Sequence, residues 1–140
     1  MPSYLAPLQV HANGAINPSS FVRGDTTADK KVLQANAATN KLIGVSQPGS
    51  YNPPGVAAKY GVSGADPAAV AAGDPILVFT TGDVCGITVG STAVTAWDQL
   101  TSDGAGNAVP AVSGNQYGAI ALNSGQPGEI IECMVMYGKA

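Results

Sequence analysis

The sequence predicts an all-β protein with a single domain, either a β-sandwich or a barrel of short strands. Eighteen glycines and ten prolines interrupt the chain too often for helices of ordinary length. Runs of β-branched and apolar residues recur at short spacing between turn signals. A chain of 140 residues can bury one core but not comfortably two. Its net charge of only −3 and its aliphatic content argue against disorder.

The predicted organisation is an extended N-terminal arm over residues 1–18, followed by one β domain over residues 19–140. Three prolines keep the arm extended, and Asn13-Gly14 marks a turn. The arm is either a disordered terminus or a segment that orders on a neighbour. We favour the second because the arm carries the apolar residues Tyr4, Leu5, Leu8, Val10 and Ile16, which we expect to contact a partner.

The first half of the domain contains four strand-like runs separated by turns. They cover residues 21–22, 31–35, 42–46 and 76–80, and the last is a dense run of β-formers, Ile-Leu-Val-Phe-Thr. Residues 47–55 form a loop rich in proline and glycine. Residues 56–72 are ambiguous: Asp66 and Pro67 suit the start of one helical turn, but an irregular loop fits equally well.

Strand signals dominate the second half of the chain. The expected strands cover residues 84–89, 92–95, 97–101, 117–122 and 129–137. In the last of these, Ile131, Cys133, Val135 and Tyr137 alternate with Glu132, Met134 and Met136. Because successive side chains of a strand point to opposite faces, this alternation predicts one purely apolar or aromatic face.

Two segments resemble each other within the chain. Residues 42–46 and 117–121 each place glycine among apolar residues, and a Gln-Pro-Gly triplet follows both. This similarity indicates a reused hairpin unit, with glycines at bulges or at close backbone approaches. It is too loose to predict a solenoid or a propeller.

Charge and hydropathy exclude several classes of partner. Only 11% of the residues are charged, against about 25% in ordinary soluble domains, so a partner, a sister subunit or a Thr/Ser/Asn-rich exterior must cover part of the surface. The six basic residues are scattered, which argues against nucleic acid. No apolar run approaches the roughly 20 residues that span a bilayer, and no signal peptide is visible. We therefore expect synthesis in the cytoplasm and no membrane contact.

No pattern for catalysis, cofactor binding or metal binding is present, so we expect no enzyme. The single histidine, His11, has no neighbouring Cys, Asp or Glu, and the carboxylates stand singly on turns. Neither a phosphate-binding loop nor a nucleophile elbow occurs. Cys85 and Cys133 are expected to be two buried thiols. The tripeptide Arg23-Gly24-Asp25 spells an integrin motif, but so short a match arises often by chance.

Trp97, the only tryptophan, allows two interpretations. General residue statistics favour burial between the sheets. The alternative is an anchor at a protein interface, where tryptophan is enriched.

Several segments together resemble the capsid decoration, or cement, proteins of phage heads. Residues 17–29 and 43–47 are similar to the start of that family. Residues 95–104, Thr-Ala-Trp-Asp-Gln-Leu-Thr-Ser-Asp-Gly, resemble its T-A-G-D-x-L-x-S-D-x-x-G stretch, and residues 117–122 with Gly128-Glu129 resemble its G-x-A-L … A-G-E ending. The order of these motifs carries the resemblance, since each is mostly turn chemistry. Trp97 departs from the pattern, which has glycine there, and so puts the geometry of that turn in doubt.

The resemblance implies a structural virion protein that binds the major capsid protein on the outside of the shell and stabilises it. It also implies an all-β fold, no catalysis and a homo-oligomer, with a trimer favoured over a dimer. The alternatives are another virion component, such as a head fibre base or a tail or baseplate module, and a carbohydrate-binding β-sandwich. The last needs exposed aromatic platforms, and this chain has one Trp and five Tyr.

Overall fold

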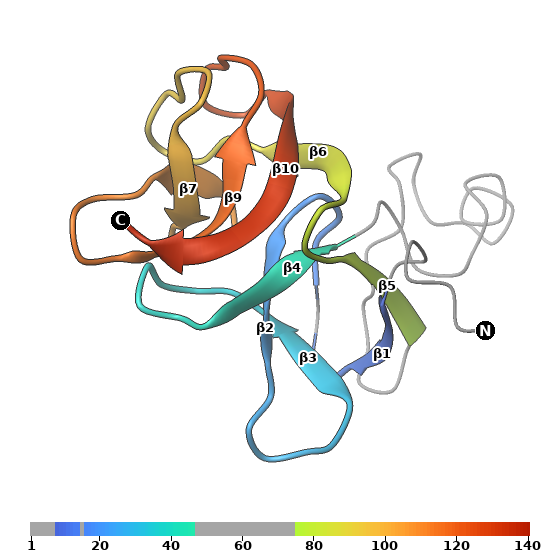
Figure 1. The fold of residues 1–140 in the computed structure, drawn as a ribbon. Helices are drawn as coiled ribbons and strands as arrows, with labels where there is room; N and C mark the ends of the chain where they lie inside the picture. The colour runs from blue at the N-terminus through green and yellow to red at the C-terminus, as the bar shows by residue number, and fades with distance from the viewer. Residues whose placement is uncertain (1–7, 15, 47–74) are drawn as a thin grey trace, which may run out of the picture.

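The protein is described by a computed structural model covering residues 8–14, 16–46 and 75–140. These residues form ten β-strands in two sheets and contain no helix (Figure 1). The described part of the chain therefore offers no helix long and apolar enough to cross a membrane. The predicted all-β fold is confirmed.

The first sheet closes into a five-stranded barrel in the order β1-β3-β2-β4-β5. The ring closes because β1 pairs with β3 in parallel on one side and with β5 in antiparallel sense on the other. Aliphatic side chains fill the interior: Val10, Ala12, Ile16, Val22, Val32 and Val78. The strands are β1 (Leu8–Ala12), β2 (Phe21–Gly24), β3 (Lys31–Gln34), β4 (Leu42–Ser46) and β5 (Pro75–Phe79).

The second sheet has five strands in the order β6-β10-β9-β7-β8. They are β6 (Val84–Thr88), β7 (Gln99–Ser102), β8 (Ala108–Pro110), β9 (Gln116–Ala121) and β10 (Ile130–Lys139). Ile131, Cys133 and Val135 are buried, as the alternation in the last strand predicts. Tyr137 is not part of that buried face and is 41% exposed. The reason is an irregularity in register against β9 between Val135 and Gly138, which interrupts the alternation.

A shared core joins the barrel to the second sheet. Phe21, Ala35, Leu42 and Val45 of the barrel are buried in one cluster with the apolar residues of the second sheet. Successive residues of β2 serve different cores, since Phe21 belongs to the shared core and Val22 to the barrel interior. In Figure 1, β4 accordingly runs beneath the red strand β10.

The two halves of the chain repeat one strand order. In the barrel, β1 lies between β3 and β5, and β4 lies between β2 and β5. In the second half, β6 pairs with β10, and β9 lies between β7 and β10. A single parallel bridge, Val89 to Ala108, connects the end of β6 to β8, as Ala12 to Val32 connects β1 to β3. The similar segments 42–46 and 117–121 form β4 and β9, which hold equivalent places.

Hydrogen bonds follow the same repeat. The Asn13 N–H donates to the Val32 carbonyl at 2.9 Å, and the Gly90 N–H donates to the Ala108 carbonyl at 2.7 Å. In the turns after β2 and β7, Asp25 accepts from the Thr27 N–H at 2.9 Å and Asp103 accepts from the Ala105 N–H at 2.8 Å. The described strands thus form two five-stranded units with the same strand order.

One type of turn precedes four strands of the structure. Each has a residue with positive φ two positions before the strand, and then Asp, Asn or Glu. Two reciprocal hydrogen bonds link this Asp, Asn or Glu to the residue three positions before it. The backbone N–H of the Asp, Asn or Glu donates to the carbonyl of that earlier residue, and its side chain accepts the backbone N–H of the same earlier residue. The positive-φ residues are Gly82, Trp97, Gly114 and Gly128. Trp97 is therefore the one non-glycine residue among these four turns, and it keeps their geometry.

Most expected strands are present, with two differences near Trp97. Residues 92–95 form only an isolated bridge, from Val94 to Gly125. Trp97 lies in the turn, so β7 begins at Gln99 rather than at residue 97. The loop expected over 47–55 and the ambiguous stretch 56–72 lie outside the described residues.

Candidate interaction surfaces

The described residues bring no metal-ligating cluster together. No group of three or more His, Cys, Asp or Glu side chains forms within residues 8–14, 16–46 and 75–140. His11 lies in β1, where its backbone pairs with Lys31 and Pro75.

The two cysteines face each other inside the second sheet. Cys85 of β6 is the direct partner of Cys133 of β10, with 3.8 Å between the two Sγ atoms. Both are buried free thiols, as expected. The hydrogen bond between them and their burial raise the pKa of the Cys133 thiol. Because the thiolate is the reactive form, this shift lowers the reactivity of Cys133, and both side chains pack in the shared core.

The Arg-Gly-Asp tripeptide is explained by the turn between β2 and β3. The Asp25 carboxylate accepts from the Thr27 hydroxyl at 2.7 Å and from the Thr27 N–H at 2.9 Å. The Asn13 side-chain amide also donates to it, which ties the end of β1 to this turn. The bonds from Thr27 and then Asn13 lower the pKa of Asp25 from 3.8 to about 2.

The titration of Asp25 tests this turn. Because its folded pKa is depressed, the carboxylate's contribution to stability is present above pH 3.8 and is lost as the pH falls through about 2. Carboxyl NMR should give a midpoint near 2, and Thr27→Val should raise it. The adjacent Thr26→Val is the control and should leave it unchanged. A midpoint near 3.8 in the wild-type protein would contradict the observed bonds.

The structure corrects the predicted N-terminal contact residues. Val10 and Ile16 are buried in the barrel interior, where neither can meet a partner. Leu8 belongs to β1, so the chain from Leu8 onward is a structural strand rather than an arm. The reason is long-range pairing with β3 and β5, which a short Leu-Gln-Val-His-Ala run does not reveal. Tyr4 and Leu5 lie outside the described residues.

Trp97 lies on the surface, and the expectation that it is buried is wrong. Its side chain is 69% exposed, and its φ is +73°. The Trp97 N–H donates to the Ala121 carbonyl at 2.7 Å, which fixes the turn to the end of β9. A left-handed conformation costs an ordinary residue about 1–2 kcal/mol. The largest side chain of the sequence is therefore held in solvent at a position that glycine fills in the three similar turns.

Further apolar side chains are exposed on the outer face of the second sheet. The strand register puts Val84 and Ile120 on either side of Met134, across β6, β10 and β9. These three side chains share one face, and Val84 is 54% exposed. Ile130, on the same face of β10, is 65% exposed. The shared core lies on the opposite face, which holds Cys85, Cys133 and Ala121.

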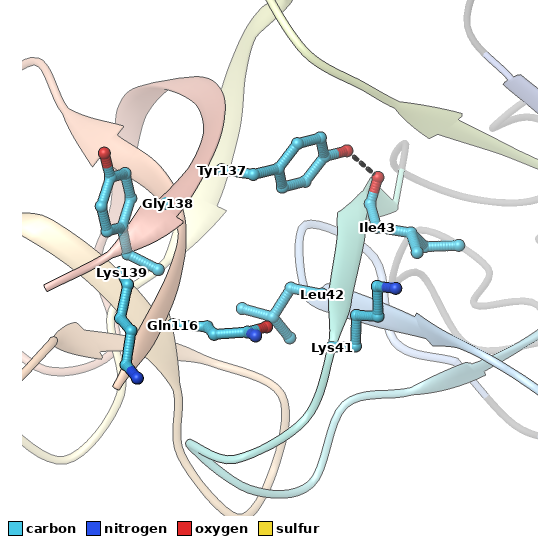
Figure 2. Close-up of a pocket in the computed structure, with 8 residues that line it drawn as sticks. Lys41, Leu42, Ile43, Gln116, Tyr137, Gly138 and Lys139 are labelled. Carbon is cyan, nitrogen blue, oxygen red and sulfur yellow. Dashed lines mark hydrogen bonds between the residues drawn. The ribbon is translucent and has the colours of Figure 1, made fainter. Parts of the chain in front are cut away.

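A pocket of about 460 Å³ opens between β4 and the ends of β9 and β10 (Figure 2). Tyr137 extends across it from β10, and its hydroxyl donates to the Ile43 carbonyl on β4. Burial raises the pKa of Tyr137 above its ordinary value of 10, so this hydroxyl stays a donor at neutral pH. Lys41 and Lys139 lie on opposite sides of the opening. Sequence reasoning missed this pocket because its residues come from distant strands and share no motif.

These features define a small all-β protein of two similar five-stranded units, with an exposed tryptophan and a strand-lined pocket. No family model and no curated protein matches the sequence. Among solved structures, the chain is similar to the N base of the head fibre protein gp8.5 of bacteriophage phi29. The TM-score is 0.61 and the identity is 14%, over 95% of each chain. At this identity the likeness establishes a shared fold.

Proposed function

We propose that this chain is a structural, non-catalytic component of a phage virion, and that it serves as the base of a head fibre on the outside of the capsid. The observation that carries the proposal is the fold that it shares with a head fibre base over 95% of both chains. The partner in this proposal is the major capsid protein, and the working form is a homo-oligomer, with a trimer favoured. A decoration protein is the second candidate, supported by the motif order in residues 95–104 and 117–129.

Co-sedimentation with mature capsids stripped of surface proteins tests both candidates. We expect saturable binding at a fixed copy number per capsid protein, because repeated shell sites are equivalent. A cement protein binds the intact shell and not its broken state, so it must also raise the temperature at which capsids open. Binding without stabilisation favours the fibre base, and binding with stabilisation favours decoration. Absence of binding contradicts both and directs the search to the tail.

We further propose that Trp97 is a contact residue for the capsid. Trp97→Gly should raise the free energy of unfolding by about 1 kcal/mol, since glycine removes the strain of the positive φ. The same change should weaken capsid binding about 30-fold, the loss typical of an interface hot spot of about 2 kcal/mol. Denaturant titration and quantitative co-sedimentation measure the two effects.

Val112→Ala is the matched control for Trp97. Val112 is 65% exposed and lies in the turn before β9, whereas Trp97 is bonded to the other end of that strand. The control should leave capsid binding unchanged. If Trp97→Gly stabilises the protein and leaves binding intact, Trp97 is not a contact residue.

A further inference from the structure

Two pockets lie next to each other at β4 and share lining residues. The pocket between β4 and β10 shares Lys41 and Ile43 with a second pocket of about 490 Å³ that reaches Arg23 and Asn40. We call the combined surface the β4 groove. It runs from the end of β10, past the edge of β4, to the end of β2.

The β4 groove gathers positive charge on an acidic protein. Of the six basic residues in a chain with net charge −3, three line it: Arg23, Lys41 and Lys139. They come from β2, the residue before β4, and β10, so the fold concentrates charge that the sequence scatters. Among the described lining residues, Asp25 is the one acid, and it lies near Arg23, so the net positive charge of the groove comes from Lys41 and Lys139.

One donor in the groove lacks an acceptor. The Nε atom of Arg23 is buried and has no hydrogen-bond partner among the described residues. Buried donors are almost always paired, so the acceptor of this atom lies outside the described residues. A carboxylate suits a guanidinium best, because the planar fork donates two parallel bonds to it.

The groove also borders two strand edges. β4 pairs with β5 only at Val45 and Ser46, and β10 pairs with β6 only up to Met134. Beyond these points, the described strands pair Leu42 and Gly138–Lys139 on one side only, and the Ile43 carbonyl accepts from the Tyr137 hydroxyl. Exposed edges accept an extended peptide through main-chain hydrogen bonds, and adjacent pockets select its side chains. This geometry favours a peptide over a sugar, which has no main chain to pair.

From the charge and the strand edges, we infer that the β4 groove binds an extended acidic peptide segment of a partner protein. Lys41 and Lys139 bind the carboxylates of this peptide. The inference holds for any protein partner and does not depend on a role in the virion.

The test uses the full chain and a fluorescein-labelled octapeptide of alternating Glu and Thr. We expect saturable binding by anisotropy that weakens as salt is raised, with amide NMR shifts centred on Lys41, Ile43 and Lys139. The double variant Lys41→Glu/Lys139→Glu should bind at least about tenfold more weakly, since like charges then oppose each other. It should instead bind the alternating Lys and Thr octapeptide, which the wild-type protein does not.

Lys30→Glu/Lys31→Glu is the control, because it makes the same change of net charge at the start of β3, in two residues that do not line the groove. It should bind the acidic peptide as the wild-type protein does. The inference is overturned if both pairs of variants weaken binding equally, if the amide shifts lie elsewhere, or if an oligogalacturonate binds at the groove and the peptide does not. Circular dichroism confirms that each variant is folded.

Discussion

Deleting residues 1–17 should abolish cooperative folding, whereas deleting residues 1–7 should not. The longer deletion removes β1, which closes the barrel between β3 and β5. It also takes Val10, Ala12 and Ile16 out of the barrel interior. Removing the side chain of one large buried aliphatic residue costs about 2–5 kcal/mol, and a whole domain is stable by only about 5–15 kcal/mol. The unpaired edges of β3 and β5 then favour aggregation.

Thermal melting followed by circular dichroism, with size-exclusion chromatography, measures the effect of each deletion. The shorter deletion is the control, because it leaves all the described pairs of β1 in place. A cooperative melt of the longer deletion close to that of the full chain would show that β1 is not part of the cooperative unit. This result would restore the view of residues 1–18 as a separable arm. Otherwise, a test of arm binding must be limited to residues 1–7, which carry Tyr4 and Leu5.

The strands could be predicted from the sequence where local signals are strong. Runs such as 42–46 and 117–122 combine β-formers with flanking turn residues, and both form strands. β1 was missed because its place depends on pairing with chain segments some 20 and 65 residues away, and such pairing leaves no trace in a five-residue run. Prolines nearby also made the segment look like a terminal arm.

The candidate surfaces were harder to predict than the fold, for two physical reasons. Burial statistics for tryptophan average over all backbone contexts, whereas the turn at Trp97 holds the side chain away from the core. The resemblance to the decoration proteins is the better signal, because their pattern has glycine at this position and glycine there indicates a positive φ. The β4 groove depends on three strands meeting, so Arg23, Lys41 and Lys139 look like scattered surface charges until the topology is known.

Phe21→Ala should destabilise both halves of the molecule together. Phe21 is fully buried, and its ring joins the barrel to the core of the second sheet. Truncation of a buried phenylalanine costs about 3–5 kcal/mol, through lost burial and the cavity left behind. If the two similar units form one cooperative domain, the lost free energy of unfolding must lower the protection from hydrogen exchange of amides in both units. Hydrogen exchange at Val32 in the barrel and at Cys133 in the second sheet measures it.

Val22→Ala provides the comparison that makes the result decisive. Val22 follows Phe21 in β2 and is equally buried, but it belongs to the barrel interior alone. Its truncation removes fewer methylene groups and should cost less, yet in a cooperative domain it lowers protection at Val32 and at Cys133 by equal free energies. If Val22→Ala lowers protection at Val32 alone, the barrel opens independently of the second sheet. The repeated strand order then reflects two units that fold separately, and Phe21 only docks one against the other.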